Sequence, residues 1–201
     1  WTIAAACAAK SVTRTVVSTD DDEIATVSLE YGAEIVIRPS DISSATAPSE
    51  AALVHVLEHL HAIENYRPDI VVFLQATSPF RARGDIDGAV EKLIADDADS
   101  LLSVSYLPGA GFLWRTEGQT VMPVNYDPQN RPRTQDFNEE YFAENGSMYI
   151  FRRHVIEESG CRLGGRITTY RQPLEHAFEI DDPKDLKIMQ NLASHLIQEN
   201  G

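Results

Sequence analysis

Polar residues suited to chemistry follow an apolar run in the segment 70–81, IVVFLQATSPFR. The run 70–74 is β-branched and aromatic, which predicts a strand buried on both faces and placed centrally in a parallel sheet. The residues that follow it include Gln75, Thr77, Ser78, Pro79 and Arg81. Ligands of open parallel sheets bind beyond the carboxyl ends of the strands, so we predict a ligand-binding loop. The alternative is a plain strand-to-helix loop in which Ser78 caps a helix and Pro79 is its first residue.

A second candidate site is the acidic run 179–182, EIDD. If this run continues a strand, the side chains of Glu179 and Asp181 would project from the same face. Adjacent carboxylates repel each other, which favours a bound divalent cation or a raised pKa. Hard oxygen ligands select Mg²⁺, which commonly joins a few carboxylates to substrate phosphates. We therefore predict a metal site, while Asp181 or Asp182 can also cap the helix that follows.

The densest basic spot of the chain is 131–136, RPRTQD. A guanidinium fork such as that of Arg133 binds carboxylate or phosphate groups in a bidentate manner. The alternative is a loop whose arginines pair with its own acids, such as Asp136. Elsewhere, His55 and His59 lie four residues apart in HVLEH, an inverted zinc-peptidase pattern. No third ligand is suggested nearby by the sequence, so zinc hydrolysis is a minor alternative.

The elements that must position these residues alternate between strands and helices. Helices are expected over 1–10, 24–31, 49–65, 84–95, 154–159 and 183–200, and strands over 12–18, 33–37, 70–74, 100–106, 147–151, 166–172 and 176–180. This alternation predicts βαβ units, hence a single α/β domain over 1–201 with a mostly parallel central sheet flanked by helices. The segment 107–142 interrupts the pattern and contains a candidate hairpin. It is too long for a simple connection, so we predict a functional excursion or an interface.

Composition excludes several classes of function. The chain has 201 residues, with 31 acidic and 17 basic side chains and a formal net charge of -14. A nucleic-acid binder would show a basic patch, and none is present. There is no apolar run long enough to cross a membrane and no signal peptide, and Cys7 and Cys161 form no disulfide framework. We predict a soluble cytoplasmic protein that, if it binds an anion, concentrates its few cations or uses a metal.

Several motifs occur together in one order along the chain. They are Val17–Asp20, Asp22–Ile24, Gly32–Ala33, Arg38–Pro39, Gln75–Pro79, Arg131–Asp136, Asn145–Gly146 before Met148–Ile150, and Glu175–Asp181. Each motif alone is weak, but the ordered set is specific and covers essentially the whole chain. Taken together, the sequence resembles the acylneuraminate cytidylyltransferases, also called CMP-sialic acid synthetases.

This resemblance implies a Rossmann-like nucleotidyltransferase fold and a definite reaction. CMP would be transferred from CTP to the anomeric hydroxyl of a nonulosonic (sialic-type) sugar acid, with Mg²⁺ present and pyrophosphate released. It also implies a homodimer, in which the excursion 107–142 packs on the partner and partly completes its site. Two alternatives stay open: a related keto-acid substrate (legionaminic, pseudaminic or deoxynonulosonic acid), or a truncated copy that acts as a dimeric binding module.

The resemblance also implies roles for individual residues. Arg38 and Ser49 would contact the cytidine end of CTP, and Gln75 would lie between the nucleotide and the sugar. Arg133 and Gln135 would meet the sugar acid. The expected substrate-binding set is completed by Thr77, Ser78 and Tyr149.

The metal site and the start of the chain complete these expectations. Asp181 and, by register, Glu179 would hold Mg²⁺, although the family usually has Asp at the position of Glu179. Asp181, Gln75 and Arg133 are the predicted catalytic residues.

The family begins with a strand and a glycine- and lysine-rich loop that wraps the triphosphate. No residue before Trp1 supplies this loop, so we expect the chain by itself to be poorly active.

Overall fold

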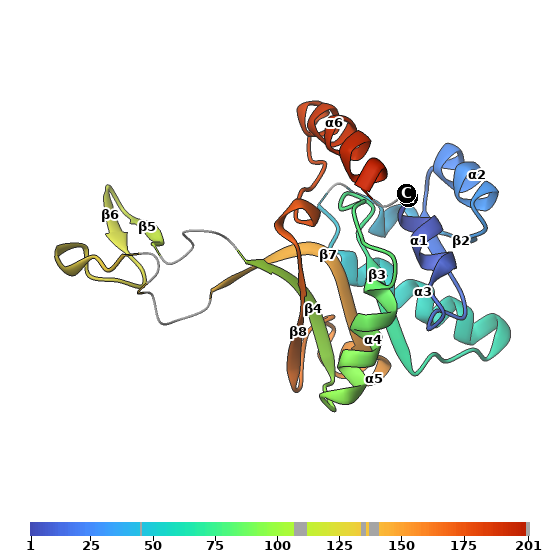
Figure 1. Cartoon of the computed structure of the whole chain (residues 1–201). Helices are drawn as coiled ribbons and strands as arrows, with labels where there is room; N and C mark the ends of the chain where they lie inside the picture. The colour runs from blue at the N-terminus through green and yellow to red at the C-terminus, as the bar shows by residue number, and fades with distance from the viewer. Residues whose placement is uncertain (45, 107–111, 134–135, 137–140, 200–201) are drawn as a thin grey trace.

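The computed structural model describes residues 1–44, 46–106, 112–133, 136 and 141–199, and its centre is a four-stranded sheet (Figure 1). In spatial order the strands are β3 (Ile70–Leu74), β7 (Phe142–Arg152), β4 (Ser100–Tyr106) and β8 (Ile167–Gln172). β7 is antiparallel to β3 and to β4, whereas β4 and β8 are parallel. Three strands therefore share one direction, and the sheet is mixed because β7 is reversed.

The reversal of β7 has a simple cause in the chain path. The excursion leaves the sheet at Tyr106, the last residue of β4, and returns at Phe142, the first residue of β7. These two residues are paired in the ladder, so the chain re-enters the sheet beside the carboxyl end of β4, where it left. A parallel neighbour would have required a connection that crosses to the opposite end of the strands before re-entering the sheet.

The strand β3 is not the central parallel strand that its apolar run predicted. Among the described residues it pairs only with β7, and each of its five residues is partly buried. Both of its faces are nevertheless covered: Ile70 and Val72 pack on one core cluster, and Val71 and Phe73 on the other. An apolar run thus reports that both faces of a strand are covered, and it carries no information about the position of the strand in the sheet.

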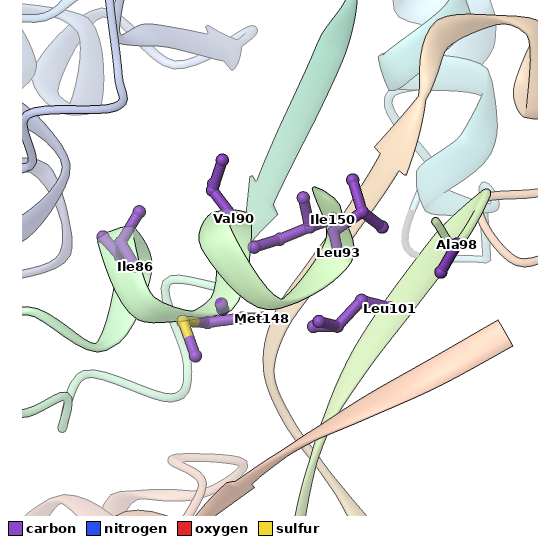
Figure 2. Close-up of a cluster of buried hydrophobic side chains, with 8 residues drawn as sticks. Ile86, Val90, Leu93, Ala98, Leu101, Met148 and Ile150 are labelled. Carbon is purple, nitrogen blue, oxygen red and sulfur yellow. The ribbon is translucent and has the colours of Figure 1, made fainter. Parts of the chain in front are cut away.

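The two faces of the sheet carry two hydrophobic clusters. The helix α4 (Asp85–Ala95) covers one face, where Leu93 packs with Leu101 of β4 and Ile150 of β7 (Figure 2). Alternate residues of β7 point to the other face, where Phe151 packs with Val155 and Ile156 of α5 (Arg153–Ser159). Leu53, Val54 and Leu57 of α3 (Ser49–Glu64) complete this second cluster. Each fully buried side chain of this size contributes about 1.5–3 kcal/mol.

A separate two-stranded parallel sheet confirms the predicted βαβ unit near the start of the chain. Its strands are β1 (Val16–Thr19) and β2 (Glu34–Ile37), and α2 (Asp22–Glu30) connects them. Four acidic residues, 20–23, surround the start of α2, and Asp21 caps the helix by accepting a hydrogen bond from the Ile24 amide at 2.9 Å. The short helix α1 (Thr2–Ala8) precedes this unit.

The remaining elements include one correction. The predicted hairpin is present as β5 (Trp114–Glu117) and β6 (Thr120–Pro123), which lie apart from the main sheet in Figure 1. The expected strand over 176–180 is wrong: a 3-10 turn, η4 (Leu174–His176), follows β8 directly. Pro173 has no amide hydrogen for a ladder, and its carbonyl accepts from the His176 amide instead. Two short 3-10 turns, η1 (Ser40–Ile42) and η2 (Pro128–Asn130), and the last helix α6 (Pro183–Glu199) complete the described elements.

Candidate functional site

A bulge in β7 shapes the centre of the candidate site. Leu102 pairs with Tyr149, whereas Val104 pairs with Glu144, so residues 145–148 of β7 lie opposite Ser103 alone. The Ser103 hydroxyl oxygen accepts a hydrogen bond from the Met148 amide at 2.8 Å, which replaces a backbone partner lost at the bulge. Bulges commonly redirect the chain beside functional sites.

The side chain of Asn145 holds the bulge in place. Its amide oxygen accepts from the Ser103 hydroxyl at 2.6 Å, and its amide nitrogen donates to Ser105 Oγ at 3.0 Å and Gln172 Oε1 at 3.1 Å. Gln172 in turn donates to the carboxylate of Asp85 at 2.8 Å. This buried network ties the bulge to β4, β8 and α4. Since both polar ends of the Asn145 side chain are engaged inside the protein, Asn145 shapes the site from within.

Three segments that are distant in sequence meet at Gly146, inside the bulge. Gly146 has a φ of +65°, and a Cβ placed on it would overlap the Glu179 carboxylate and lie 2.8 Å from Gln75 Oε1. The Ser78 hydroxyl donates to Glu179 Oε1 at 3.1 Å, and the Ile180 amide donates to the Thr77 carbonyl at 2.8 Å. The structure thus brings together the loop after β3, the bulge of β7 and the acidic run. The sequence alone did not predict that these three segments meet.

The predicted loop residues divide into internal and accessible groups. Ser78 is fully buried and holds Glu179, while Gln75 is partly buried beside Gly146 and Thr77 is exposed. Ser78 does not cap a helix, because α4 begins only at Asp85 and its cap is Gly84. The alternative of a plain strand-to-helix loop is therefore excluded for Ser78.

The aspartates of the acidic run have different surroundings: one caps a helix and the other is exposed. Asp182 precedes α6 and caps it, since its Oδ1 accepts from the amides of Lys184 at 2.6 Å and Asp185 at 3.0 Å. Asp185 accepts in return from the amides of Asp181 and Asp182, both at 3.0 Å. The Asp181 side chain is exposed and lies outside this cap. Because the expected strand is absent, the argument that Glu179 and Asp181 share one strand face no longer applies.

The described residues contain no group of three or more His, Cys, Asp and Glu side chains that could hold a metal ion. The ring centres of His55 and His59 lie 6.0 Å apart. Among the described residues these two histidines have no third ligand, which a zinc site would need. Mg²⁺ has a different requirement, because one or two carboxylates together with substrate phosphates suffice. The hard carboxylate oxygens of Glu179 and Asp181 fit that donor set.

The basic segment of the excursion is engaged with its own acid. The Arg133 side chain donates from Nε and Nη2 to the two carboxylate oxygens of Asp136, at 2.6 and 3.0 Å, and both side chains are exposed. In Figure 1 the described part of the excursion lies away from the main sheet. Within the described residues, the contacts of Arg133 join it to Asp136 and not to Gln75. Gln135 lies outside the described residues.

Of the two residues expected at the cytidine end, Arg38 lies at the carboxyl ends of β1 and β2, and Ser49 lies at the start of α3. Arg38 follows β2 directly, and its Nη2 is 3.6 Å from Asp20 Oδ1. Its Nε is buried and makes no hydrogen bond within the described part of the chain. Ser49 is the first residue of α3. A pocket of about 510 Å³ lies beside it, but the lining includes Asp41, Glu50 and Glu58, so this pocket repels a triphosphate.

Tyr149 lies on the sheet face that α3 and α5 cover. It is 3% exposed, its ring stacks on Phe73 with centroids 5.9 Å apart, and the Arg162 guanidinium lies 4.2 Å from its ring centre. Burial, together with a hydrogen bond to Glu144, raises the pKa of Tyr149 to about 12. Arg162 also pairs with Glu50 at 2.6 Å. Arg162 was not predicted, because it lies between Gly160 and Gly164 in a segment without a recognisable motif.

Comparisons with known proteins agree with this architecture. Among solved structures, CMP:2-keto-3-deoxy-manno-octonic acid synthetase complexed with CTP matches with a TM-score of 0.65 at 17% identity, over 95% of this chain and 85% of that chain. A likeness at this identity shows the fold. It confirms the predicted Rossmann-like α/β nucleotidyltransferase architecture.

Curated relatives point to the same group. N-acylneuraminate cytidylyltransferase A of Danio rerio is 32% identical over 185 residues, covering 90% of this chain and 41% of that protein. The N-acylneuraminate cytidylyltransferase of Oncorhynchus mykiss is 32% identical over 187 residues, covering 90% and 40%. Post-translational flagellin modification protein B of Campylobacter coli is 26% identical over 178 residues, covering 88% and 75%. The chain spans about two fifths of the length of the first two relatives.

The match to a family model extends over the whole chain. A sequence model described as Cytidylyltransferase matches residues 1–201, the entire sequence. The predicted family is thereby confirmed. This chain belongs to the cytidylyltransferase family.

Proposed function

We propose that the chain is a cytoplasmic enzyme that transfers CMP from CTP to the anomeric hydroxyl of a nonulosonic sugar acid. The observation that carries the proposal is the meeting of Gln75, Gly146 and Glu179 beyond the carboxyl end of β3. Two relatives at 32% identity are named for N-acylneuraminate cytidylyl transfer, which supports the nucleotide and the class of sugar acid. In the reaction, the sugar hydroxyl oxygen attacks the α-phosphorus of CTP, its proton leaves, and the bond to pyrophosphate breaks.

Three side chains would orient the two substrates. Arg38 would bind the cytidine end, since its buried Nε has an unused donor near the end of β2. Gln75 would orient the sugar hydroxyl for attack, because its amide can both donate and accept. Thr77, which is exposed in the same loop, would contact the nucleotide beside Gln75. Holding the two reactants in register supplies a large part of the rate acceleration in such transfers.

Glu179 and Asp181 would hold Mg²⁺, as their donor chemistry allows. When bound, the cation neutralises charge on the phosphates and on the departing pyrophosphate. The contribution of the chain is to fix one of the two carboxylates: Ser78 orients Glu179 against Gly146, while Asp181 stays accessible at the start of α6. Because the chain has a formal net charge of -14, such neutralisation favours the binding of an anionic substrate.

Asp181→Ala tests the assignment of the accessible carboxylate. We expect metal-dependent turnover to fall at least ~100-fold, because a charge-stabilising group is lost. The fold should persist, since Asp182 and Asp185 form the cap of α6 without the Asp181 side chain. Pyrophosphate release and circular dichroism measure the two effects. Asp182→Asn, which alters the cap and leaves both proposed metal ligands, is the matched control, and an active Asp181→Ala enzyme would exclude Asp181 from the reaction.

The function itself is tested by substrate titration. Calorimetry with CTP, with and without Mg²⁺, measures nucleotide binding, and pyrophosphate release is then followed with a panel of sugar acids. N-acetylneuraminic acid should react, while legionaminic, pseudaminic and deoxynonulosonic acids separate the related substrates. Tight CTP binding without pyrophosphate release from any sugar acid would favour the second candidate, a dimeric binding module. Failure to bind CTP at all would contradict the proposal.

The homodimer belongs to the same proposal. The Arg133 side chain is exposed and belongs to the excursion, whose hairpin lies apart from the main sheet in Figure 1. We propose that a second copy receives this segment and that Arg133, with Gln135, meets the sugar acid in the partner's site. The pairing of Arg133 with Asp136 would then be exchanged for the substrate carboxylate, which has the same geometry for a guanidinium fork.

A further inference from the structure

The guanidinium of Arg81 connects two of the three segments that form the site. Its Nη2 donates to the carbonyl of Gln75 at 3.1 Å and to the carbonyl of Ser147, next to Gly146, at 2.5 Å. Its Nη1 donates to the Thr2 hydroxyl at 3.2 Å. One planar group therefore spans the loop after β3 and the bulge of β7.

This arrangement is costly for stability. Burial lowers the pKa of Arg81 to about 10, against the opposing influence of the Asp85 charge. Among the described residues, no carboxylate lies within ion-pair distance of Arg81, and its Nε is buried without a partner. A charge held away from water without an ion partner is unfavourable, and here only hydrogen bonds to neutral oxygens offset that cost. A role beyond stability therefore explains why a charged residue occupies this position.

We propose that Arg81 is a positioning residue, which holds Gln75 and the Gly146 bulge at the spacing that admits Glu179 between them. Lysine carries the same charge but lacks the planar fork that reaches two carbonyls at once. Arg81 itself faces backbone carbonyls and a hydroxyl, so it acts on the reaction through Gln75. The kinetic consequence rests on the proposed function, whereas the structural consequence does not.

The kinetic test compares Arg81→Lys and Arg81→Met with the control Arg83→Met, which removes an exposed arginine two residues away. Because misplacement of a reacting group by about 1 Å can cost roughly 100-fold in rate, we expect kcat to fall by ~10- to 100-fold in both Arg81 variants. The KM for CTP should stay within about threefold, since Arg81 donates to two backbone carbonyls and the Thr2 hydroxyl and is assigned no contact with the nucleotide. The control should keep wild-type values of kcat and KM.

A second measurement does not depend on activity. Amide hydrogen exchange should become faster in 75–81 and 145–147 of both Arg81 variants, and stay unchanged in α4 and α5. Unchanged exchange in these segments would overturn the proposal, as would an Arg81→Lys protein that is folded and has a wild-type kcat. If the wild-type protein makes no CMP-sugar but the exchange pattern changes as expected, the proposed function fails and the positioning role stands.

Discussion

At the scale of single residues, Gly146 combines a positive φ with contacts from two site side chains. Replacing it by alanine places a methyl group against the Glu179 carboxylate and Gln75 Oε1. We expect Gly146→Ala to lower stability by about 1–3 kcal/mol through backbone strain, and also to displace both side chains. Urea unfolding measures the first effect, and CMP-sugar formation together with CTP binding measures the second.

The chain offers a matched control for that substitution. Gly160 has a φ of +67°, close to the +65° of Gly146, but a Cβ there would meet nothing within 4 Å. Gly160→Ala should therefore show the backbone strain alone and keep full activity. If Gly146→Ala and Gly160→Ala lose stability equally and both remain active, Gly146 is required only for its backbone conformation.

The site residues differ in how far sequence could reveal them. Gln75 and Glu179 were predicted because each belongs to a local pattern: polar residues after an apolar run, and a cluster of acids. The roles of Ser103, Asn145 and Arg81 depend on a bulge between two strands more than 30 residues apart. No local pattern encodes such a register shift, so their contacts became visible only in the folded chain.

At the scale of elements, Asp87 of α4 ties the end of the first helical segment to the core. Its carboxylate accepts from the Ser11 amide at 2.8 Å, the Ser11 hydroxyl at 2.6 Å and the Lys10 amide at 3.2 Å. These hydrogen bonds, led by that of the Ser11 hydroxyl, lower the pKa of Asp87 below its ordinary value of 3.8. A lowered pKa means that the folded state binds this proton less readily than the unfolded state.

The stabilisation from Asp87 is therefore present above its ordinary pKa and is lost as the pH falls through the lowered one. We expect Asp87→Asn to lower the melting temperature at pH 6, and the difference from wild type to shrink as the pH falls below about 4. Thermal melts between pH 6 and 3 measure this. Asp97→Asn, which changes an exposed aspartate, should show a small difference at every pH. A constant difference for Asp87→Asn would contradict the assignment.

Element boundaries were well predicted where the determinants are local. The periodicity of 49–65 and 84–95, the acidic cap of α2 and the turn residues of the hairpin all gave correct elements. The strand expected over 176–180 failed because Pro173 starts a 3-10 turn and the Ile180 amide finds its partner in the distant Thr77 carbonyl. That partner lies more than 100 residues away in the sequence, and secondary-structure propensities, which depend on neighbouring residues, cannot predict such a contact.

At the scale of the whole molecule, direction and order of strands were the least predictable features. The alternation of strands and helices indicated parallel neighbours, and β1 with β2 and β4 with β8 follow that rule. β7 does not follow that rule, because the excursion returns to the sheet at the same end of the strands from which it departed. Within the described residues, no helix combines the length and the apolar character needed to span a bilayer.

The excursion also bears on assembly, because its hairpin exposes large apolar side chains. Trp114, Val121 and Met122 are 50%, 61% and 44% exposed on a hairpin that lies apart from the main sheet. If a second copy covers this surface, as we propose, Val121→Asp should convert a dimer into a monomer, since a buried unpaired carboxylate is strongly unfavourable. Light scattering coupled to size-exclusion chromatography gives the mass directly.

The same variant separates assembly from catalysis. Because Arg133 would reach the site only from the partner, the monomer should keep Mg²⁺-dependent CTP binding while the KM for the sugar acid rises at least ~10-fold, the scale of one lost charge-assisted contact. Ile37→Asp, at an exposed apolar residue of β2 outside the excursion, should leave both mass and KM unchanged. A wild-type protein that is monomeric, or a monomeric variant with an unchanged KM for the sugar acid, would show that each chain completes its own site.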